Sequence, residues 1–169
     1  MPTIRIVEFR PLIAIIFLFF FTAVPARAQN TEKTDFFIAP LAEILGYSRQ
    51  GPSFGGGVAV GAGNGVAIGA RFLYAVDTES VNTVELAVFM RFYPGGADAC
   101  TGLFVQLNAG AFVLGLHEIP FAFAKSGSIS AGIAAGWRFP LGERWYMEPS
   151  VRVGYPYMLG AGVAFAFRL

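Results

Sequence analysis

Apolar and polar residues alternate along the chain from residue 36 onward, in runs of about ten residues, a length typical of strands that cross a membrane. An alternation with a period of two indicates β-strands with two different faces. Clusters of turn-forming residues separate the runs, as at Gly51-Pro52 and at residues 61–65. The pattern predicts eight strands, at residues 36–49, 53–61, 65–76, 84–93, 102–114, 128–139, 144–155 and 158–169.

The charged residues inside these runs fall on one face of each strand. Glu85 and Arg91 lie an even number of residues apart, as do Glu148 and Arg152, so each pair shares a face. Large aliphatic and aromatic side chains occupy the other face of the last six predicted strands. The first strand fits the pattern least well, because it is apolar on both faces apart from Glu43, and a short amphipathic segment is the alternative there.

The charged face is otherwise occupied by small residues. This composition indicates whether the charged face lies inside or outside the barrel. A soluble barrel would cover its outer face with many charges, whereas a face of Gly, Ala and Ser with a few Arg and Glu suits a narrow, filled lumen. The sequence therefore predicts an all-β, eight-stranded, antiparallel, up-and-down transmembrane β-barrel with lipid outside. Its predicted lumen network comprises Glu43, Arg71, Glu85, Arg91, Arg138, Glu148, Arg152 and Arg168.

Aromatic residues gather near one end of the predicted strands. If the N-terminus lies in the periplasm, these residues fall at the periplasmic rim, where membrane barrels carry an aromatic girdle. The alternative is the general preference of aromatic residues for strands. The predicted girdle comprises Phe92, Trp137, Phe139, Trp145 and Phe167.

The N-terminal segment has the features of a secretory signal peptide. Arg5 and Arg10 precede an apolar run from Leu12 to Val24, which is shorter than the ~20 residues that a transmembrane helix needs. Pro25 and the small-x-small motif that ends at Ala28 follow this run, so we expect cleavage after Ala28, with an uncleaved anchor as the alternative. The predicted organisation is a signal peptide at 1–28, a lead-in at 29–35 and the barrel at 36–169.

Composition narrows the function classes. The chain is 55% hydrophobic and only 14% charged, too apolar for an ordinary soluble domain. A formal net charge of +1 argues against a nucleic-acid partner. One Cys and one His are too few for a zinc site, so we expect no metal and no cofactor.

The strand pattern of residues 36–169 resembles the small eight-stranded outer-membrane barrels of the OmpX, OmpW and opacity-protein group. The segment 136–149 is similar to the strand-turn-strand unit of such barrels, and residues 162–167 resemble their C-terminal assembly signal. The chain departs from that signal because it continues through Arg168 and ends in Leu169, not in an aromatic residue. The resemblance implies a bacterial outer-membrane location, contact with outer-membrane lipid, and recognition of the C-terminal strand by the barrel-assembly machinery.

Three functions remain open at this point. The first is a structural or surface-interaction role, in which the loops at 77–83 and 116–127 contact partners such as a host molecule. The second is a narrow, porin-like conduit for small polar or hydrophobic solutes. The third and least favoured is a lipid-modifying enzyme that uses His117, because no nucleophile is fixed near this histidine; we expect no catalytic residues. The candidate surface contacts are His117, Glu118, Phe121 and Phe123.

Overall fold

The alternating pattern folds into eight antiparallel strands in this computed structural model, which describes residues 35–47, 50–77, 81–94, 101–116 and 126–169. All eight predicted strands are present, and their ends differ from the prediction by at most three residues. The strands are β1 (Phe36–Tyr47), β2 (Gln50–Asn64), β3 (Val66–Asp77), β4 (Val81–Phe92), β5 (Gly102–Leu116), β6 (Ser126–Pro140), β7 (Trp145–Tyr155) and β8 (Leu159–Arg168). The predicted signal peptide lies outside the described residues.

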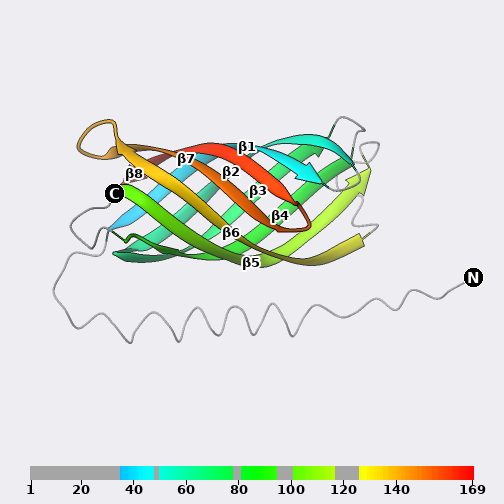
Figure 1. Ribbon diagram of the computed structural model, residues 1–169, viewed down its shortest axis with the longest axis horizontal. Helices are drawn as coiled ribbons and strands as arrows, with labels where there is room; N and C mark the ends of the chain where they lie inside the picture. Colours follow the sequence, from blue (N-terminus) through cyan, green and yellow to red (C-terminus); the bar gives the residue numbers. More distant parts are fainter. Residues whose placement is uncertain (1–34, 48–49, 78–80, 95–100, 117–125) are drawn as a thin grey trace, which may run out of the picture. The chain divides into compact units, whose positions relative to one another are not determined.

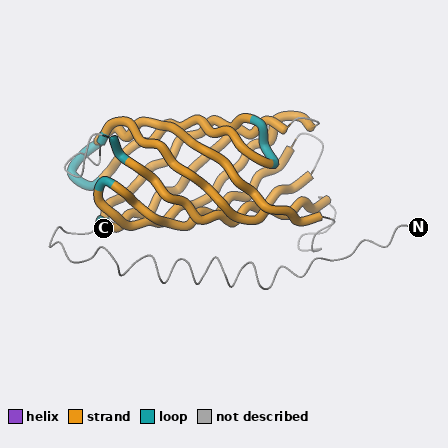
Figure 2. The backbone as a smooth tube through the Cα atoms, turned by 60° about the horizontal axis from the view of Figure 1, so that its bottom comes forward, coloured by secondary structure: helices purple, strands orange, loops and turns teal. Residues whose placement is uncertain are grey.

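The strands follow one another around a closed barrel (Figures 1 and 2). Each strand pairs with the next one in the sequence, and β8 returns to pair with β1 from Phe37↔Arg168 to Gly46↔Leu159. The amide of Leu169 donates to the carbonyl oxygen of Phe36 over 2.9 Å, which brings the two ends of the barrel sequence together. The predicted fold class, a closed antiparallel up-and-down β-barrel, is therefore confirmed.

No stretch of the described residues forms a helix that is long and apolar enough to cross a membrane.

One local prediction differs from the structure. Gly51-Pro52 and residues 61–64 are expected to form turns, whereas β2 runs through both and only Gly65 separates β2 from β3. Gly63 allows this tight connection, because its φ of +143° is rarely adopted by other residues and a Cβ there would lie 2.1 Å from the carbonyl oxygen of Val66. For β1, the predicted strand is confirmed, because it is a full strand paired on both sides, and the alternative of a short amphipathic segment is not borne out.

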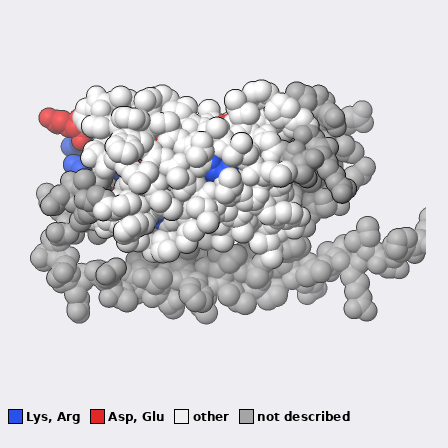
Figure 3. Space-filling model, in the orientation of Figure 1, with Lys and Arg blue, Asp and Glu red and all other residues white. Residues whose placement is uncertain are grey.

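The barrel is apolar outside and polar inside. Leu86, Ile133 and Val151 on the outer wall are 51–61% exposed, whereas Glu148 and Arg152 on the inner wall are 1–3% exposed. In the face shown in Figure 3, the wall is almost entirely uncharged and charges gather at the end that holds the β6–β7 turn, where Glu143 and Arg144 are exposed. This distribution is the reverse of that in a soluble barrel.

Glycines on the inner wall make room for the large inner side chains. A Cβ at Gly69 would lie 2.3 Å from Cζ of Phe89, and one at Gly162 would lie 2.5 Å from Cγ of Glu43. The same complementarity joins Gly61 to Phe37, Gly136 to Phe104, Gly132 to Tyr157 and Gly160 to Arg152. A narrow barrel can hold rings and guanidinium groups only where the facing residues have no side chain.

Candidate functional site

The inner wall carries seven of the eight charged residues predicted for the lumen. Each is at most 8% exposed, and they come from β1, β3, β4, β6 and β7. Strand alternation explains their direction, because every second residue of a strand points to the same side. They form two groups along the barrel: Arg91, Arg138 and Glu148 towards the end where β1 begins and β8 ends, and Glu43, Arg71, Glu85 and Arg152 nearer the opposite end.

The first group, which we call the terminal-side cluster, is centred on Glu148. One carboxylate oxygen of Glu148 accepts a hydrogen bond from Nη1 of Arg91 over 2.8 Å, and the other accepts from Nε of Arg138. Nε of Arg91 donates to Oε1 of Gln106 over 2.8 Å, and Nη1 of Arg91 also donates to the Tyr93 hydroxyl over 3.3 Å. One carboxylate thus holds two guanidinium groups and links three strands.

Aromatic rings surround the two arginines of this cluster. The guanidinium carbon of Arg91 lies 4.2 Å from the centre of the Phe104 ring, and that of Arg138 lies 5.1 Å from the centres of the Tyr93 and Tyr146 rings. In contacts of this kind, the negative face of the aromatic ring attracts the cation and stabilises it away from water.

The second group, the loop-side cluster, is a four-residue network of ion pairs. Oε2 of Glu43 lies 2.6 Å from Nη2 of Arg71 and 3.0 Å from Nε of Arg152. Arg152 also donates from Nη2 to Oε2 of Glu85 over 3.0 Å. The Arg152 guanidinium lies 3.8 Å from the centre of the Tyr157 ring, which covers the cluster from the β7–β8 connection, and burial raises the pKa of the Tyr157 phenol.

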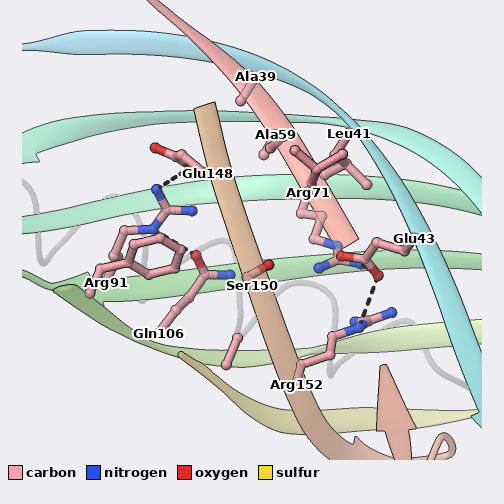
Figure 4. Close-up of a pocket in the computed structure, with 14 residues that line it drawn as sticks. Ala39, Leu41, Glu43, Ala59, Arg71, Arg91, Gln106, Glu148, Ser150 and Arg152 are labelled. Atoms are coloured by element: carbon pink, nitrogen blue, oxygen red, sulfur yellow. Dashed lines mark hydrogen bonds and ion pairs between the residues drawn. The ribbon is translucent and has the colours of Figure 1, made fainter. Parts of the chain in front are cut away.

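A cavity of about 30 Å³ separates the two clusters. Arg91, Gln106 and Glu148 line one side of it, Glu43, Arg71 and Arg152 line the other, and Ser150 lies between them (Figure 4). A volume of this size holds about two water molecules.

The eighth predicted lumen residue, Arg168, lies elsewhere. Its side chain is 42% exposed, and Nη1 pairs with Oδ2 of Asp35 over 3.3 Å. Arg168 points to the correct side of the sheet, but it is the last residue of β8 and therefore reaches the opening of the barrel, not the buried network. The prediction that Arg168 belongs to the lumen network is therefore wrong.

Four further polar residues belong to the lumen network, although the sequence analysis did not predict them as members. Gln106 and Asn108 are joined by a hydrogen bond of 2.6 Å from Nε2 of Gln106 to Oδ1 of Asn108, and the strand alternation had already placed both on the polar face. Tyr93 and Tyr157 lie just beyond strand ends and turn their rings inward. Parity with Arg91 indicates the direction of Tyr93, whereas no sequence signal gives that of Tyr157.

The predicted girdle residues lie at the barrel end where β1 begins and β8 ends. Phe92, Trp137, Phe139 and Trp145 are 42–52% exposed on the outer wall. Trp145 and Phe167 lie opposite each other on β7 and β8, with ring centres 4.8 Å apart, and the rings of Trp137 and Phe139 lie 6.3 Å apart along β6.

The outer wall is hollowed where Trp137 of β6 faces Pro149 of β7. The β6–β7 pairing is in register on both sides of this point but is interrupted at Trp137 and Arg138. Pro149 has no N–H to donate, which accounts for the interruption. The hollow is lined by Leu103, Ala135, Gly136, Trp137, Pro149, Ser150, Val151, Ala161 and Gly162.

The candidate surface contacts His117, Glu118, Phe121 and Phe123 lie outside the described residues. Within the described ranges, no group of three or more His, Cys, Asp or Glu side chains is arranged to hold a metal ion.

Comparison with solved structures shows the same fold at low sequence identity. OprG, an outer membrane protein from Pseudomonas aeruginosa, aligns with a TM-score of 0.55 at 9% identity, over 83% of this chain and 98% of that one. Neisserial surface protein A (NspA) aligns with a TM-score of 0.55 at 8% identity, over 80% and 96%. The N-terminal β-barrel domain of OprF from Pseudomonas aeruginosa aligns with a TM-score of 0.52 at 18% identity, over 80% and 97%. The predicted resemblance to small outer-membrane barrels is confirmed at the level of the fold.

Comparison at the sequence level gives one match. No curated protein matches the chain. Residues 66–162, from the start of β3 into β8, match a family of proteins. The chain belongs to this family, which is described as "Protein of unknown function (DUF3575)".

Proposed function

We propose that the protein is an integral β-barrel of the bacterial outer membrane with a lumen closed by its own side chains, and that it has a structural or surface-interaction role. The apolar outer wall supports the membrane location, because lipid solvates apolar side chains. The inner wall supports it as well, because its charged side chains face away from lipid and pair with one another inside the barrel. The exposed aromatic residues at the barrel end where β1 begins and β8 ends would form the periplasmic girdle.

The observation that carries the closed lumen is the pair of ion-paired clusters that spans it. Arg91 and Arg138 hold Glu148, while Arg71 and Arg152 hold Glu43, and the cavity between the clusters is only about 30 Å³. An ion passing through would have to break these buried pairs, which is costly. We therefore propose that solutes do not pass through the lumen.

Export and assembly complete the proposal. We propose that residues 1–28 direct export and are removed after Ala28, and that the barrel-assembly machinery recognises β8. The pairing of β8 with β1 supports a role for β8 in the final step of assembly, because that pairing closes the barrel. The loops at the barrel end where β1 ends and β8 begins would then face the outside of the cell and meet a host molecule or a small ligand.

We also propose that the protein is not an enzyme. The buried carboxylates of Glu43, Glu85 and Glu148 each pair with arginine, which suits a packing role better than proton transfer. Replacing His117 by Ala should leave the lipid composition of the host membrane unchanged; an altered composition would instead support lipid-modifying activity.

Conductance of the purified protein in planar lipid bilayers tests the closed lumen. Before measurement, a heat-modifiable band on a gel and β-rich circular dichroism should show that the barrel has formed. We expect no steady single-channel steps from the wild type. Arg71→Ala combined with Arg152→Ala serves as the matched variant, since it removes the side chains that fill the loop-side cluster and should raise conductance. Steady steps from the wild type would support the alternative of a narrow conduit.

A further inference from the structure

The pairing of the β7–β8 hairpin with its neighbours is interrupted on both sides. On the β6 side, pairing stops at residues 148–149 of β7, and on the β1 side it stops at residues 39–40 of β1. The register is the same before and after each gap, so neither gap is a bulge. The four ladders from β2 through to β6, and the ladder between β7 and β8, run without a gap. The hairpin is therefore a continuous pair of strands between two weakened edges.

A proline at each gap removes a hydrogen-bond donor. In an antiparallel ladder, the N–H and C=O groups of every second residue point to the same neighbouring strand. The carbonyl oxygen of Trp145 accepts from the β6–β7 turn, so an N–H four residues later, at position 149, would point to β6. The carbonyl oxygen of Phe36 accepts from the residue that follows β8, so an N–H at position 40 would point to β8. Pro149 and Pro40 have no N–H to place there.

The two gaps set off one end of the hairpin. They lie at nearly the same level, because Met147 pairs with Phe165 across the hairpin. Towards the barrel end where β1 begins and β8 ends, each edge keeps, among the described residues, two ladder pairs and one further backbone hydrogen bond. Towards the other end, each edge has six ladder pairs. We call the weakly held part, residues 145–149 of β7 and 165–168 of β8, the flap.

Glu148 holds the flap against the rest of the barrel. It is the one buried charged residue of the flap, at 1% exposure. Its carboxylate pairs with Arg91 of β4 and Arg138 of β6, which both lie outside the flap. The register of the ladder places Arg138 opposite Glu148 at the gap, so a side-chain ion pair stands where the backbone pairing is missing. The Tyr146 ring of the flap depends on the same contact, because it lies against the Arg138 guanidinium.

We propose that the flap opens and closes as one unit, that Glu148 holds it closed, and that the rest of the barrel stays closed when the flap opens. The continuous β7–β8 ladder joins the two strands of the flap, so its two weak edges separate together. Opening breaks the pairs of Glu148 with Arg91 and Arg138 and brings the terminal-side cluster into contact with water. The six ladder pairs beyond each gap keep the loop-side cluster closed. Segments with few backbone hydrogen bonds are those that open locally at the lowest free energy.

Hydrogen exchange of the full chain folded in detergent micelles, measured by NMR, tests the proposal. The amides of Trp137 and Phe167 report on the two edges, because they point to β7 and to β1, respectively. In the wild type, both should exchange faster than the amides of β3 and β4, whose ladder has no gap. Pro149→Val adds a donor at the β6 edge and should slow exchange about fivefold at both reporters. Slower exchange at Phe167, on the other edge, is the sign of a single unit.

Three variants complete the experiment. Glu148→Gln removes the carboxylate and should speed exchange at both reporters by about a hundredfold or more. Glu85→Gln, in the loop-side cluster, is the control for loss of a buried carboxylate and should leave both reporters unchanged. Pro52→Val, at an exposed position of β2, is the control for loss of a proline and should also leave them unchanged.

Three outcomes would overturn the proposal. The first is a wild type in which Trp137 and Phe167 exchange no faster than the amides of β3 and β4. The second is a Pro149→Val variant in which exchange slows at Trp137 alone, since the two edges then open separately. The third is a Glu148→Gln variant with unchanged exchange at both reporters. If Glu148→Gln does not fold, Pro40→Val decides the matter, because slower exchange at Trp137 supports a single unit and unchanged exchange there rejects it.

Discussion

Arg91 on β4 donates from Nη1 to a carboxylate oxygen of Glu148 on β7 over 2.8 Å, across the inside of the barrel. These strands are not neighbours, so this contact ties together parts of the wall that no backbone ladder connects. The same carboxylate also accepts from Arg138, which makes Glu148 the residue on which the terminal-side cluster depends.

Glu148→Gln should strongly destabilise the barrel. Arg91 and Arg138 would stay charged and buried without a carboxylate, and breaking a buried ion pair costs about 3–5 kcal/mol. Equilibrium unfolding in urea and detergent, followed by tryptophan fluorescence, measures the change. Glu143→Gln, in the exposed turn, should change stability by less than about 0.5 kcal/mol. Equal stabilities for the two variants would contradict the role given to Glu148.

Gly69→Ala should destabilise the barrel by overpacking. The added Cβ would lie 2.3 Å from Cζ of Phe89 and 2.2 Å from the carbonyl oxygen of Val60, and strain of this kind costs about 1–3 kcal/mol. Gly142→Ala is the matched control, because nothing lies within 4 Å of its Cβ position. The two variants are compared by the temperature at which the compact gel band disappears. A Gly69→Ala barrel as heat-resistant as the Gly142→Ala barrel would argue against tight packing of the inner wall.

Pro149→Val should stabilise the wall between β6 and β7. The new N–H would face the carbonyl oxygen of Trp137 and restore the interrupted ladder, a gain of about 1 kcal/mol for one hydrogen bond. Hydrogen exchange of the Trp137 amide, which lies opposite residue 149, should slow as local opening becomes rarer. Pro94→Ala, just after β4, controls for the removal of a proline. Unchanged exchange at Trp137 would show that Pro149 does not weaken the ladder.

Trp145 and Phe167 should be energetically coupled. Their ring centres lie 4.8 Å apart across β7 and β8, and aromatic pairs contribute about 0.5–1.5 kcal/mol beyond the burial of area. A double-mutant cycle with Trp145→Ala and Phe167→Ala in lipid vesicles measures this coupling. The cycle of Trp145→Ala with Phe92→Ala should give a value near zero, since β4 and β7 are not neighbours. Similar values in both cycles would contradict a specific contact.

The strand alternation was the part of the structure that sequence reasoning could predict. The shared parity of Glu85 with Arg91, and of Glu148 with Arg152, indicated which side chains point inward without any knowledge of the fold. Parity does not reveal which residues meet across the lumen. Glu43 pairs with Arg71, whereas Arg91 pairs with Glu148, and these choices depend on strand tilt and on the register of all the intervening strands.

Strand ends were harder to predict than strand interiors. Residues 61–64 have the composition of a turn, yet they continue β2. They do so because each of them pairs with a residue of β3, which favours the extended chain. Arg168 has the parity of a lumen residue but lies too close to the end of β8 to be buried. Alternation fixes the direction of a side chain, and its depth in the barrel is set by where the strand begins and ends.

The seam between β1 and β8 has a consequence for how the chain folds. Phe37 and Arg168 pair although nearly the whole described sequence lies between them, so the contacts of this seam are among the most distant in the barrel sequence. Contacts of such long range carry the largest loop-closure entropy and form late. Until β8 arrives, β1 presents an unpaired edge that can pair with other chains. The barrel is thus most vulnerable to aggregation in the interval before its last strand docks, and protection of the nascent β1 edge is the step on which its yield depends.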